Sequence, residues 1–351
     1  MTIVPGLMLA AALAVAGNYL AQLIGVDLLE LPKSPISPIM MAILLGVLLR
    51  NTVKLPAAVE PGIKFSLQRI LRLGIVLLGI RLSLGEVGLI GLKALPVILI
   101  TVSVALVVVN FVSKRLGLSA RMGSLIAVGT SICGATAIMA TAPTINATDE
   151  EVSYSVACIA LFGMAAMLAY PFAAHWLFSG DPFLSGLFLG TAVHDTAQVA
   201  GAGLVYQQYF GEPGALDAAT VTKLVRNLGM LIVIPLMSIL YHRNSSEGAE
   251  PPAWYSMVPL FVIGFAMMSL LRTVGDMGEK AFGFMDPGQW NSMVNLTRET
   301  AGYCLAIAMA AVGLGTRISN LRTIGPKPLV AGLVSALIVG ATSALTLLAL
   351  Y

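Results

Sequence analysis

Long apolar stretches recur along the whole chain, and they constrain the fold more than any other feature. Hydrophobic residues make up 58% of the sequence and charged residues only 11%. A soluble domain usually has about a quarter of its residues charged, so this chain cannot cover a surface that faces water. A helix that crosses a bilayer needs roughly 20 mostly apolar residues, and the stretches supply them. The composition predicts an all-α, polytopic membrane protein whose partner is the lipid bilayer.

Eleven apolar segments can be drawn, and most of the connections between them are short. The segments do not alternate in polarity as the strands of a membrane β-barrel do. We therefore expect residues 1–351 to form a single integral membrane domain of about eleven helical spans, with no appended soluble domain. The segments are 5–24, 35–50, 66–82, 93–113, 121–142, 152–178, 182–203, 217–241, 254–272, 297–315 and 327–350.

The distribution of Lys and Arg over the short loops predicts the orientation of the chain, because cytoplasmic loops carry an excess of both. Alternating the loops from the start places the N-terminus in the cytoplasm and the C-terminus outside. The cytoplasmic side then carries Arg50, Lys54, Lys64, Lys114, Arg115, Arg121, Arg243, Arg317, Arg322 and Lys327, and the outer side carries Asp27, Glu30, Glu212 and the turn Asp149-Glu150-Glu151.

One short motif occurs twice. Gly79-Ile80-Arg81-Leu82-Ser83 recurs as Gly315-Thr316-Arg317-Ile318-Ser319, and each copy is followed by an Ile-Gly pair and a lysine. In the topology above, the first copy lies outside and the second inside, so the two units would be inverted. Inverted repeats are typical of secondary transporters, although a chain this rich in small and aliphatic residues also repeats such motifs by chance.

The segment 129–137, Gly-Thr-Ser-Ile-Cys-Gly-Ala-Thr-Ala, lies in the middle of an apolar stretch. Its two glycines, and the Ser and Thr residues around them, favour a break in the helix between Ser131 and Gly134, next to Cys133. A half-helix that starts at Ala135 would present free N–H groups, which bind anions. The hydroxyls of Thr130, Ser131 and Thr136 would add further donors. The other interpretation is close helix packing through small residues.

The segment 190–198, Gly-Thr-Ala-Val-His-Asp-Thr-Ala-Gln, is the most polar run inside any apolar stretch. A charged side chain at membrane depth is costly and usually faces a functional cavity. Asp195 and Gln198 would share a helix face, and Asp195 could carry a coupling proton or bind a cation. His194 titrates near neutral pH. Alternatively, Asp195 pairs with a Lys or Arg of another helix.

The two polar segments also resemble each other, since Gly-Thr-Ser-Ile-Cys at 129–133 corresponds to Gly-Thr-Ala-Val-His at 190–194. With one span between them, the two helices would run parallel. The sequence does not distinguish a repeat from a coincidence here.

Further charged residues occur near the starts of two later segments. Lys223 and Arg226 share a face near the start of the eighth one, with Arg226 two turns inside. They could neutralise an anionic substrate, pair with Asp195 or reach back to lipid headgroups. Arg298 and Glu299, beside Asn295, start the tenth segment, where an Arg-Glu pair is more often structural.

Several function classes lack support. The three cysteines share no CxxC spacing, so neither a disulfide nor a metal site is expected, and no cofactor is expected. The net charge of +3 forms no basic stripe, so a nucleic-acid partner is not expected. No GxSxG motif supports an intramembrane enzyme with Ser131 or Cys133 as nucleophile and His194 as base, and the chain is predicted not to be an enzyme. The motif of ATP-driven pumps is also missing.

The sequence resembles the YeiH-type family of bacterial inner-membrane proteins from about residue 35 to the C-terminus. The resemblance is carried by Gly-Thr-Ser-Ile-Cys-Gly-Ala at 129–135, His-Asp-Thr-Ala-Gln-Val at 194–199 and Lys-Leu-Val-Arg-Asn at 223–227. That family is described as sulfate exporters related to cation/proton antiporters. The resemblance implies inverted repeats, crossing discontinuous helices and an elevator-like motion. It carries over to Ser131, Cys133, Gly134, His194, Asp195, Gln198, Lys223 and Arg226.

These observations predict a secondary transporter for a small anion, with sulfate as the first candidate. The half-helix at Ala135, together with Lys223 and Arg226, would bind the anion, and Asp195 with His194 would couple a proton. In the alternative, Asp195, Gln198 and unwound carbonyls hold sodium while the half-helix holds a carboxylate. A homodimer would suit an elevator scaffold.

Overall fold

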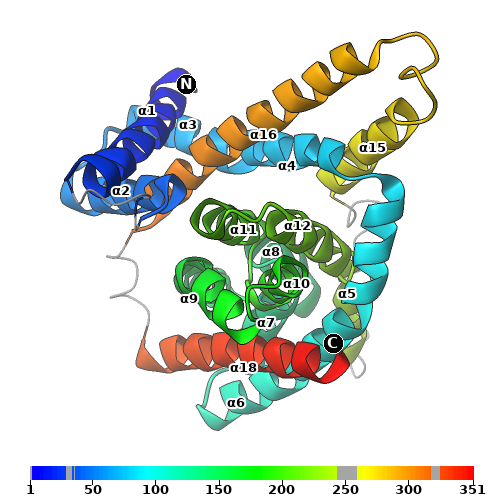
Figure 1. The fold of residues 1–351 in the computed structure, drawn as a ribbon. Helices are drawn as coiled ribbons and strands as arrows, with labels where there is room; N and C mark the ends of the chain where they lie inside the picture. The colour runs from blue at the N-terminus through cyan, green and yellow to red at the C-terminus, as the bar shows by residue number, and fades with distance from the viewer. Residues whose placement is uncertain (1, 29–33, 35, 243–258, 318–324) are drawn as a thin grey trace. The chain divides into compact units, whose positions relative to one another are not determined.

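The structure is a computed structural model, and it describes residues 2–28, 34, 36–242, 259–317 and 325–351. The described residues are almost entirely helical, with one isolated antiparallel bridge between Ala281 and Met285. Figure 1 shows the ribbon. The α-helices are α1 (Val4–Gln22), α2 (Pro38–Thr52), α3 (Glu60–Phe65), α4 (Leu71–Leu78), α5 (Leu84–Val104), α6 (Asn110–Arg115), α7 (Ala120–Ser131), α8 (Ala135–Thr141), α9 (Asp149–Leu177), α10 (Pro182–Ala192), α11 (Thr196–Phe210), α12 (Gly214–Asn227), α13 (Met230–His242), α15 (Leu260–Gly275), α16 (Pro287–Gly315) and α18 (Pro326–Leu350). The 3-10 turns are η2 (Ala57–Val59), η4 (Gly79–Arg81) and η6 (Pro143–Ile145), and the π-helical turns are η1 (Leu23–Leu28), η3 (Ser66–Ile70) and η5 (Ala105–Val109).

Polar caps and prolines set where several helices begin. The side chains of Ser37, Ser119, Asp181 and Asp286 accept a backbone N–H of α2, α7, α10 and α16 respectively. Thr148 forms a full capping box with Glu151 at the start of α9. Such caps satisfy N–H groups that have no partner inside the helix.

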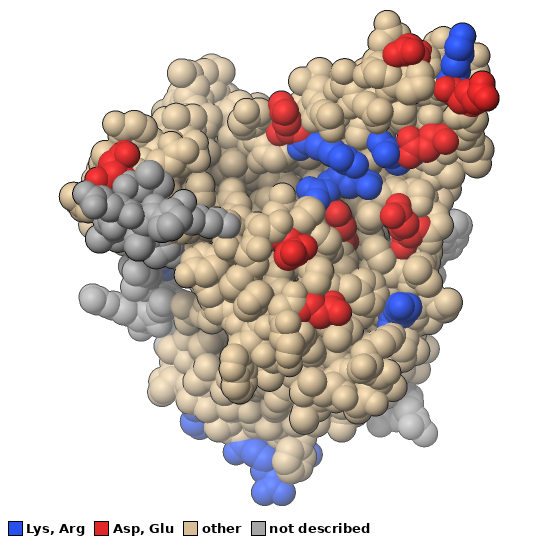
Figure 2. Space-filling model, viewed as in Figure 1, with Lys and Arg blue, Asp and Glu red and all other residues tan. Residues whose placement is uncertain are grey.

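Among the described residues, five helical segments are long and apolar enough to cross a membrane: α1, the run 84–115, α9, the run 214–241 and α18. The helices α2, α10 and α15 are apolar but shorter. Figure 2 shows wide surface areas without Lys, Arg, Asp or Glu, as expected of a protein in contact with lipid. Every apolar segment expected from the sequence coincides with helix where it is described, but the count of eleven spans stays a prediction.

The chain divides into two compact units, each described by itself. Unit 1 comprises residues 1–89, 204–213 and 260–319, and unit 2 comprises residues 90–203, 214–259 and 320–351. The helices α5 and α11 contribute to both. The expectation of a single domain is not decided by this division.

In unit 1, small residues let α1, α2 and α16 approach closely. A methyl group added to Gly17 of α1 would lie 2.7 Å from the Ala42 nitrogen of α2, and one added to Gly46 would lie 2.7 Å from the Ala310 carbonyl oxygen of α16. Such packing through small residues is common in membrane helices. At one end of these helices, Glu60 accepts hydrogen bonds from Arg50 and Arg317, which lower the pKa of its carboxyl.

In unit 2, the segment 121–142 does not run straight on as one span. A methyl group on Gly129 of α7 would lie 2.7 Å from Cδ1 of Ile138 on α8. Nine residues along a straight helix cover about 13 Å, so α8 must fold back along α7. We call this pair the first hairpin (residues 120–141). In agreement, Ser119 at its start donates a hydrogen bond to Glu151 in the first turn of α9.

This hairpin corrects the expected topology. The turn Asp149-Glu150-Glu151 was placed on the side opposite to Arg121, yet the Ser119–Glu151 bond puts this turn at the same end of unit 2 as the start of α7. The physical reason is that a helix broken in its middle can return to the side it came from. The positions Glu30, Arg243, Arg322 and part of the second copy of the Gly-Ile-Arg motif lie outside the described residues.

The helices α10 and α11 form a second hairpin (residues 182–203). A methyl group on Gly186 would lie 2.5 Å from Cβ of Ala218, and one on Gly190 would lie 2.6 Å from Cβ of Thr222, so α10 runs parallel to α12. In contrast, Gly203 of α11 lies against Leu216, near the start of α12, while Thr196 hydrogen-bonds Asn227 at its end. The helix α11 is therefore antiparallel to α12 and to α10.

The two hairpins start at opposite ends of unit 2. Gly214, the first residue of α12, lies beside Pro182, the first residue of α10. At the far end of the following helix α13, Tyr241 hydrogen-bonds Ser124 of α7 at 2.9 Å. The run α12–α13 thus connects the base of the second hairpin to the base of the first. The polar segments 129–135 and 190–196 are inverted relative to each other, and the expectation that they run parallel is wrong. Figure 1 shows α7, α8, α10 and α12 close together.

Candidate functional site

The non-helical residues at the turns of the two hairpins lie together. The first tip (residues 132–134) contains the expected break, and α8 begins at Ala135 as predicted. Gly134 has φ +71° and ψ −130°, a conformation that is nearly restricted to glycine. A methyl group there would also lie 2.9 Å from Oδ2 of Asp195, in the second tip (residues 193–195). Glycine is required here by both backbone and space.

Lys223 of α12 joins the two tips. Its Nζ donates to the carbonyl oxygens of Ile132 at 2.7 Å and of Val193 at 3.1 Å, and also to that of His194. Ile132 and Val193 occupy equivalent positions in the two related segments. An ammonium group has three donors, so these carbonyls use all of them.

Arg226, one turn further along α12, repeats this pattern at the preceding residues. Its guanidinium donates to the Thr130 carbonyl, to the Ser131 carbonyl at 2.7 Å and to the Thr191 carbonyl at 2.6 Å. Further bonds reach the carbonyls of Gly190 and Val193, at 3.3 and 3.1 Å. Thr130 and Thr191 are again equivalent positions.

Both cations therefore cap the C-terminal ends of α7 and α10. The last carbonyls of a helix have no partner within it and carry a partial negative charge. Lys223 and Arg226 are 0% and 1% exposed, so they satisfy and neutralise these carbonyls within the protein. We call the arrangement the Lys223–Arg226 clamp. Its hydrogen bonds go to backbone, so any effect of Lys223 on an anion comes through its charge.

Asp195 and Gln198 form the start of α11. Asp195 Oδ1 accepts the Ala197 N–H at 2.9 Å, and Gln198 Oε1 accepts the Asp195 N–H at 3.1 Å, as in a capping box. Gln198 Nε2 donates to the Ala160 carbonyl of α9 at 3.1 Å. Among the described ion pairs, none joins Asp195 to Lys223 or Arg226.

The remaining residues expected at the site are mostly turned inward. The hydroxyls of Thr130 and Ser131 donate to carbonyls of their own helix, those of Ile126 and Val128. The Cys133 thiol is buried and lies 3.4 Å from the Met230 sulfur. His194 is fully buried, and neither ring nitrogen has a hydrogen-bond partner.

The accessible part of the site lies where the returning arms begin. Thr136 is exposed, and Ala135, Asp195 and Thr196 are partly exposed. The other residues of both tips are buried. A ligand can therefore reach the first residues of α8 and α11, flanked by the hydroxyls of Thr136 and Thr196 and by the Asp195 carboxylate. These are donors for an oxyanion and one group that can carry a proton.

Comparison with known proteins places the chain in a family. A family model described as "Conserved hypothetical protein 698" matches residues 5–332. A UPF0324 membrane protein of Fusobacterium nucleatum is 32% identical over 308 residues, which are 85% of each chain. The chain belongs to the UPF0324 membrane-protein family. A UPF0324 relative from Corynebacterium glutamicum is 33% identical over 90% of this chain and 85% of its own. One from Streptococcus agalactiae is 31% identical over 94% and 92%. No solved structure matches.

Two features of the site in this UPF0324 protein could not be predicted from the sequence. The second break, at residues 193–195, was not predicted, and neither Thr196 nor Asn227 was proposed as part of the site. The signal that could have found the break is the likeness of 129–135 to 190–196, since equivalent residues turn at equivalent positions.

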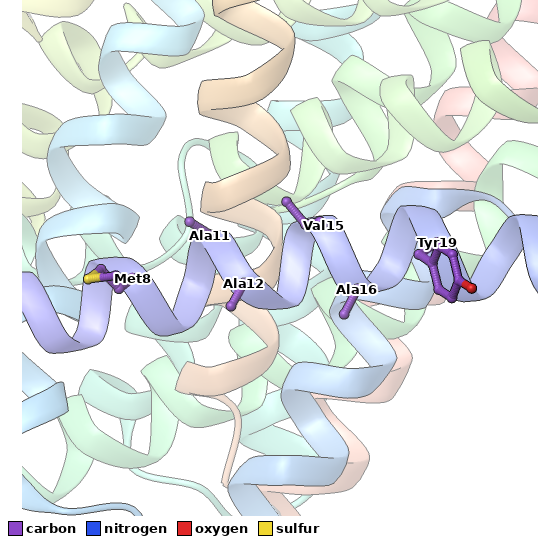
Figure 3. A pocket seen from close by; sticks show the side chains of 6 residues that line it. All are labelled: Met8, Ala11, Ala12, Val15, Ala16 and Tyr19. Atoms are coloured by element: carbon purple, nitrogen blue, oxygen red, sulfur yellow. The ribbon is translucent and has the colours of Figure 1, made fainter.

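Other regions of this UPF0324 protein have fewer polar groups that could bind a substrate. A shallow groove along α1 is lined by Met8, Ala11, Ala12, Val15, Ala16 and Tyr19 (Figure 3). Its lining is almost entirely apolar, so it suits a lipid chain or a helix better than a polar substrate. Within the part of the chain that the structure describes, no three His, Cys, Asp or Glu side chains gather as a metal site. Arg298 and Glu299 lie exposed within α16 rather than at its start.

Proposed function

We propose that this UPF0324 membrane protein is a proton-linked secondary transporter for a small anion, with sulfate as the first substrate to test. The observation that carries the proposal is the Lys223–Arg226 clamp, which holds together the tips of two oppositely directed hairpins. Non-helical backbone at membrane depth is tolerated only where it is buried in protein or lines a cavity. Secondary transporters place such backbone near the bilayer midplane, between inverted repeats, and bind their substrates there.

The charges of the site favour an anion over a cation. Two buried cations, Lys223 and Arg226, outnumber the one carboxylate of the site, Asp195, so the site has a positive formal charge. The negative ends of α7 and α10 are capped by the clamp, while the accessible residues lie at the N-terminal ends of α8 and α11. N-terminal helix ends carry partial positive charge. An anion at the tips is therefore attracted from several directions.

A sodium-coupled carboxylate carrier, the other candidate, has less support. It requires unwound carbonyls to bind sodium, but those of Ile132, Val193 and His194 already accept from Lys223. The Gln198 amide is likewise engaged with Ala160 and Asp195. An ammonium ion of the protein thus stands where the coupling sodium would be coordinated.

Asp195 is the group we assign to proton coupling. Its carboxylate caps the start of α11, which is also where an anion would bind. Two negative charges at one helix end repel each other, so protonation of Asp195 favours binding of the anion. Protonation of Asp195 and binding of the anion are therefore coupled without direct contact between the proton and the anion. His194 is a second buried titratable group beside it.

Alternating access completes the proposal. All residues of the site belong to unit 2, so we propose that unit 2 moves as a body and exposes the tips to each side of the inner membrane in turn. The elevator-like motion implied by the family resemblance is of this kind. The N-terminus would then lie in the cytoplasm, where the basic loops are expected.

Flux of radiolabelled sulfate into proteoliposomes, with and without an imposed pH gradient, tests the proposal. We expect saturable flux that responds to the pH gradient and is indifferent to sodium. In Asp195→Asn the response to the gradient should disappear, while Glu299→Gln, an exposed acidic side chain of α16, serves as the charge-matched control. Gradient-driven flux at wild-type rates in Asp195→Asn would remove Asp195 from the mechanism. Flux of succinate that requires sodium would favour the carboxylate carrier.

A further inference from the structure

A polar pair lies beside the second tip, formed by Thr196 at the start of α11 and Asn227 at the end of α12. We infer that the Thr196 hydroxyl donates a hydrogen bond to the transported oxyanion and that Asn227 positions this hydroxyl. The inference rests on the proposed function and adds the residue that contacts the substrate. Asn227 Nδ2 donates to Thr196 Oγ1 at 3.2 Å.

The direction of this hydrogen bond determines what Thr196 can do. Because its oxygen accepts from Asn227, its proton is available for another acceptor. Three buried threonines of unit 2 hydrogen-bond a carbonyl of their own helix: Thr130 that of Ile126, Thr191 that of Leu187 and Thr220 that of Leu216. Each bonds the carbonyl four residues back.

Thr196 has no such carbonyl. It is the first residue of α11, and the residue four positions earlier, Ala192, ends the other arm of the hairpin. Thr196 is also partly exposed, unlike those three threonines. Its hydroxyl is therefore the donor at this tip that a ligand can reach, beside the positive end of a 15-residue helix.

Asn227 gives the second, independent observation. It is 1% exposed, and its Oδ1 has no hydrogen-bond partner. Leaving a buried polar atom without a partner is unfavourable, and native proteins tolerate it mainly at functional positions. Oδ1 is an acceptor, so a bare oxyanion does not complete it; it is completed by a ligand that brings a proton, as an anion moved together with a proton does.

The chemistry fits a small oxyanion. Thr196 offers one donor from the second hairpin, and Thr136, exposed at the start of the returning arm of the first, offers another hydroxyl. Hydrogen bonds to charged acceptors are stronger than neutral ones. Oxygens of a sulfate or of a carboxylate could both accept them, so the test includes both.

The test compares uptake of labelled sulfate and labelled succinate by vesicles that contain the wild type or variants. Thr196→Val keeps the shape and removes the hydroxyl, so KM for the transported anion should rise about 10- to 100-fold, as expected for loss of a hydrogen bond to a charged group. Thr196→Ser should retain near wild-type KM. Thr220→Val, whose hydroxyl serves only its own helix, is the matched control and should leave KM unchanged.

Asn227→Ala provides the second arm, and it remains informative if Thr196→Val folds poorly. It should raise KM more than it lowers kcat, and combining it with Thr196→Val should add little, because both remove the same hydroxyl contact. A merely structural pair would lower the amount of folded protein and leave KM unchanged.

The outcomes separate this inference from the proposed function. If the wild type transports either anion and both Thr196→Val and Asn227→Ala keep wild-type KM, the inference is wrong and the transporter stands. If sealed vesicles with the wild type move neither anion, the proposed function fails and takes the inference with it.

Discussion

The two hairpins share a backbone plan but differ in the chemistry of their tips. Both turn at equivalent residues, and both present carbonyls to the Lys223–Arg226 clamp. From the next equivalent position on, the first hairpin has Cys133, Gly134 and Ala135, whereas the second has His194, Asp195 and Thr196. The first thus supplies small residues that allow close approach, and the second supplies groups that can bind and titrate. Of the two inverted hairpins, the first is therefore specialised for packing and the second for binding and titration.

The largest effect should come from the clamp, because it is the feature that the two hairpins share. Arg226→Met removes the donors to carbonyls of both hairpins and leaves those carbonyls buried without partners. A buried carbonyl that loses its hydrogen-bond partner typically costs about 1–3 kcal/mol, and several carbonyls lose theirs here. We expect poor recovery of monodisperse protein and a large fall in the thermal unfolding temperature in detergent. Lys114→Met, an exposed cation at the end of α6, is the control and should behave as the wild type.

Arg226→Lys tests whether charge alone is sufficient. A lysine has three donors on a single atom, whereas the guanidinium spreads its donors over three nitrogens and bonds five carbonyls, so a lysine at this position cannot replace all of them. We expect an unfolding temperature between those of Arg226→Met and the wild type. If Arg226→Met were as stable as the wild type, the clamp would not hold the hairpins together.

The clamp also shows what the sequence could reveal. The sequence shows Lys223 and Arg226 as two cations on one helix face, with Arg226 two turns inside an apolar segment, and it leaves burial and contact with lipid headgroups equally open. Their hydrogen-bond partners could not be predicted, because backbone carbonyls carry no sequence signal and the bonds span 91 to 96 residues to the first hairpin and 29 to 36 to the second. From the sequence alone, contact of Lys223 and Arg226 with an anion was as plausible as the capping of helix ends.

The break at Gly134 could be predicted, but its consequence could not. Glycines mark where a helix is weak, and this local property was sufficient to place the start of α8. Whether the chain continues across the membrane or turns back depends on packing between Gly129 and Ile138, which local propensity does not determine. Counting spans from hydropathy therefore reversed the side assigned to the Asp149-Glu150-Glu151 turn. The second hairpin also returns to the side from which it came, so the segments that follow it keep the sides that the loop charges assign to them.

An intermediate effect is expected from Gly134→Ala, which tests the packing role of the first tip. The positive φ costs a residue with a side chain about 1–3 kcal/mol, and the added methyl group would lie 2.9 Å from Asp195 Oδ2. We expect a lower unfolding temperature and slower flux, because Asp195 must move. Gly88→Ala is the control, since Gly88 lies in α5 with free space around its Cα. If Gly134→Ala behaved as Gly88→Ala does, the tips would not be in contact in the working protein.

The smallest effect should come from Gly163→Ala on α9, which tests the chemical role of the second tip. A methyl group there would lie 2.0 Å from Gln198 Oε1, so the amide must leave both Ala160 and the Asp195 N–H. Only a flexible side chain has to move, and each lost bond contributes about 1 kcal/mol. We expect nearly normal stability but a shifted pH dependence of flux, because the backbone of Asp195 loses its support.

A double-mutant comparison makes that last prediction specific to the second hairpin. Gln198→Ala should shift the pH dependence in the same direction as Gly163→Ala, and the double variant should resemble Gln198→Ala alone, since the methyl group then meets no amide. Additive shifts would mean that Gly163 acts through some other contact. Unchanged pH profiles in all three variants would show that Asp195 does not depend on Gln198, and the second tip would then differ from the first in residue type alone, without a dedicated support on α9.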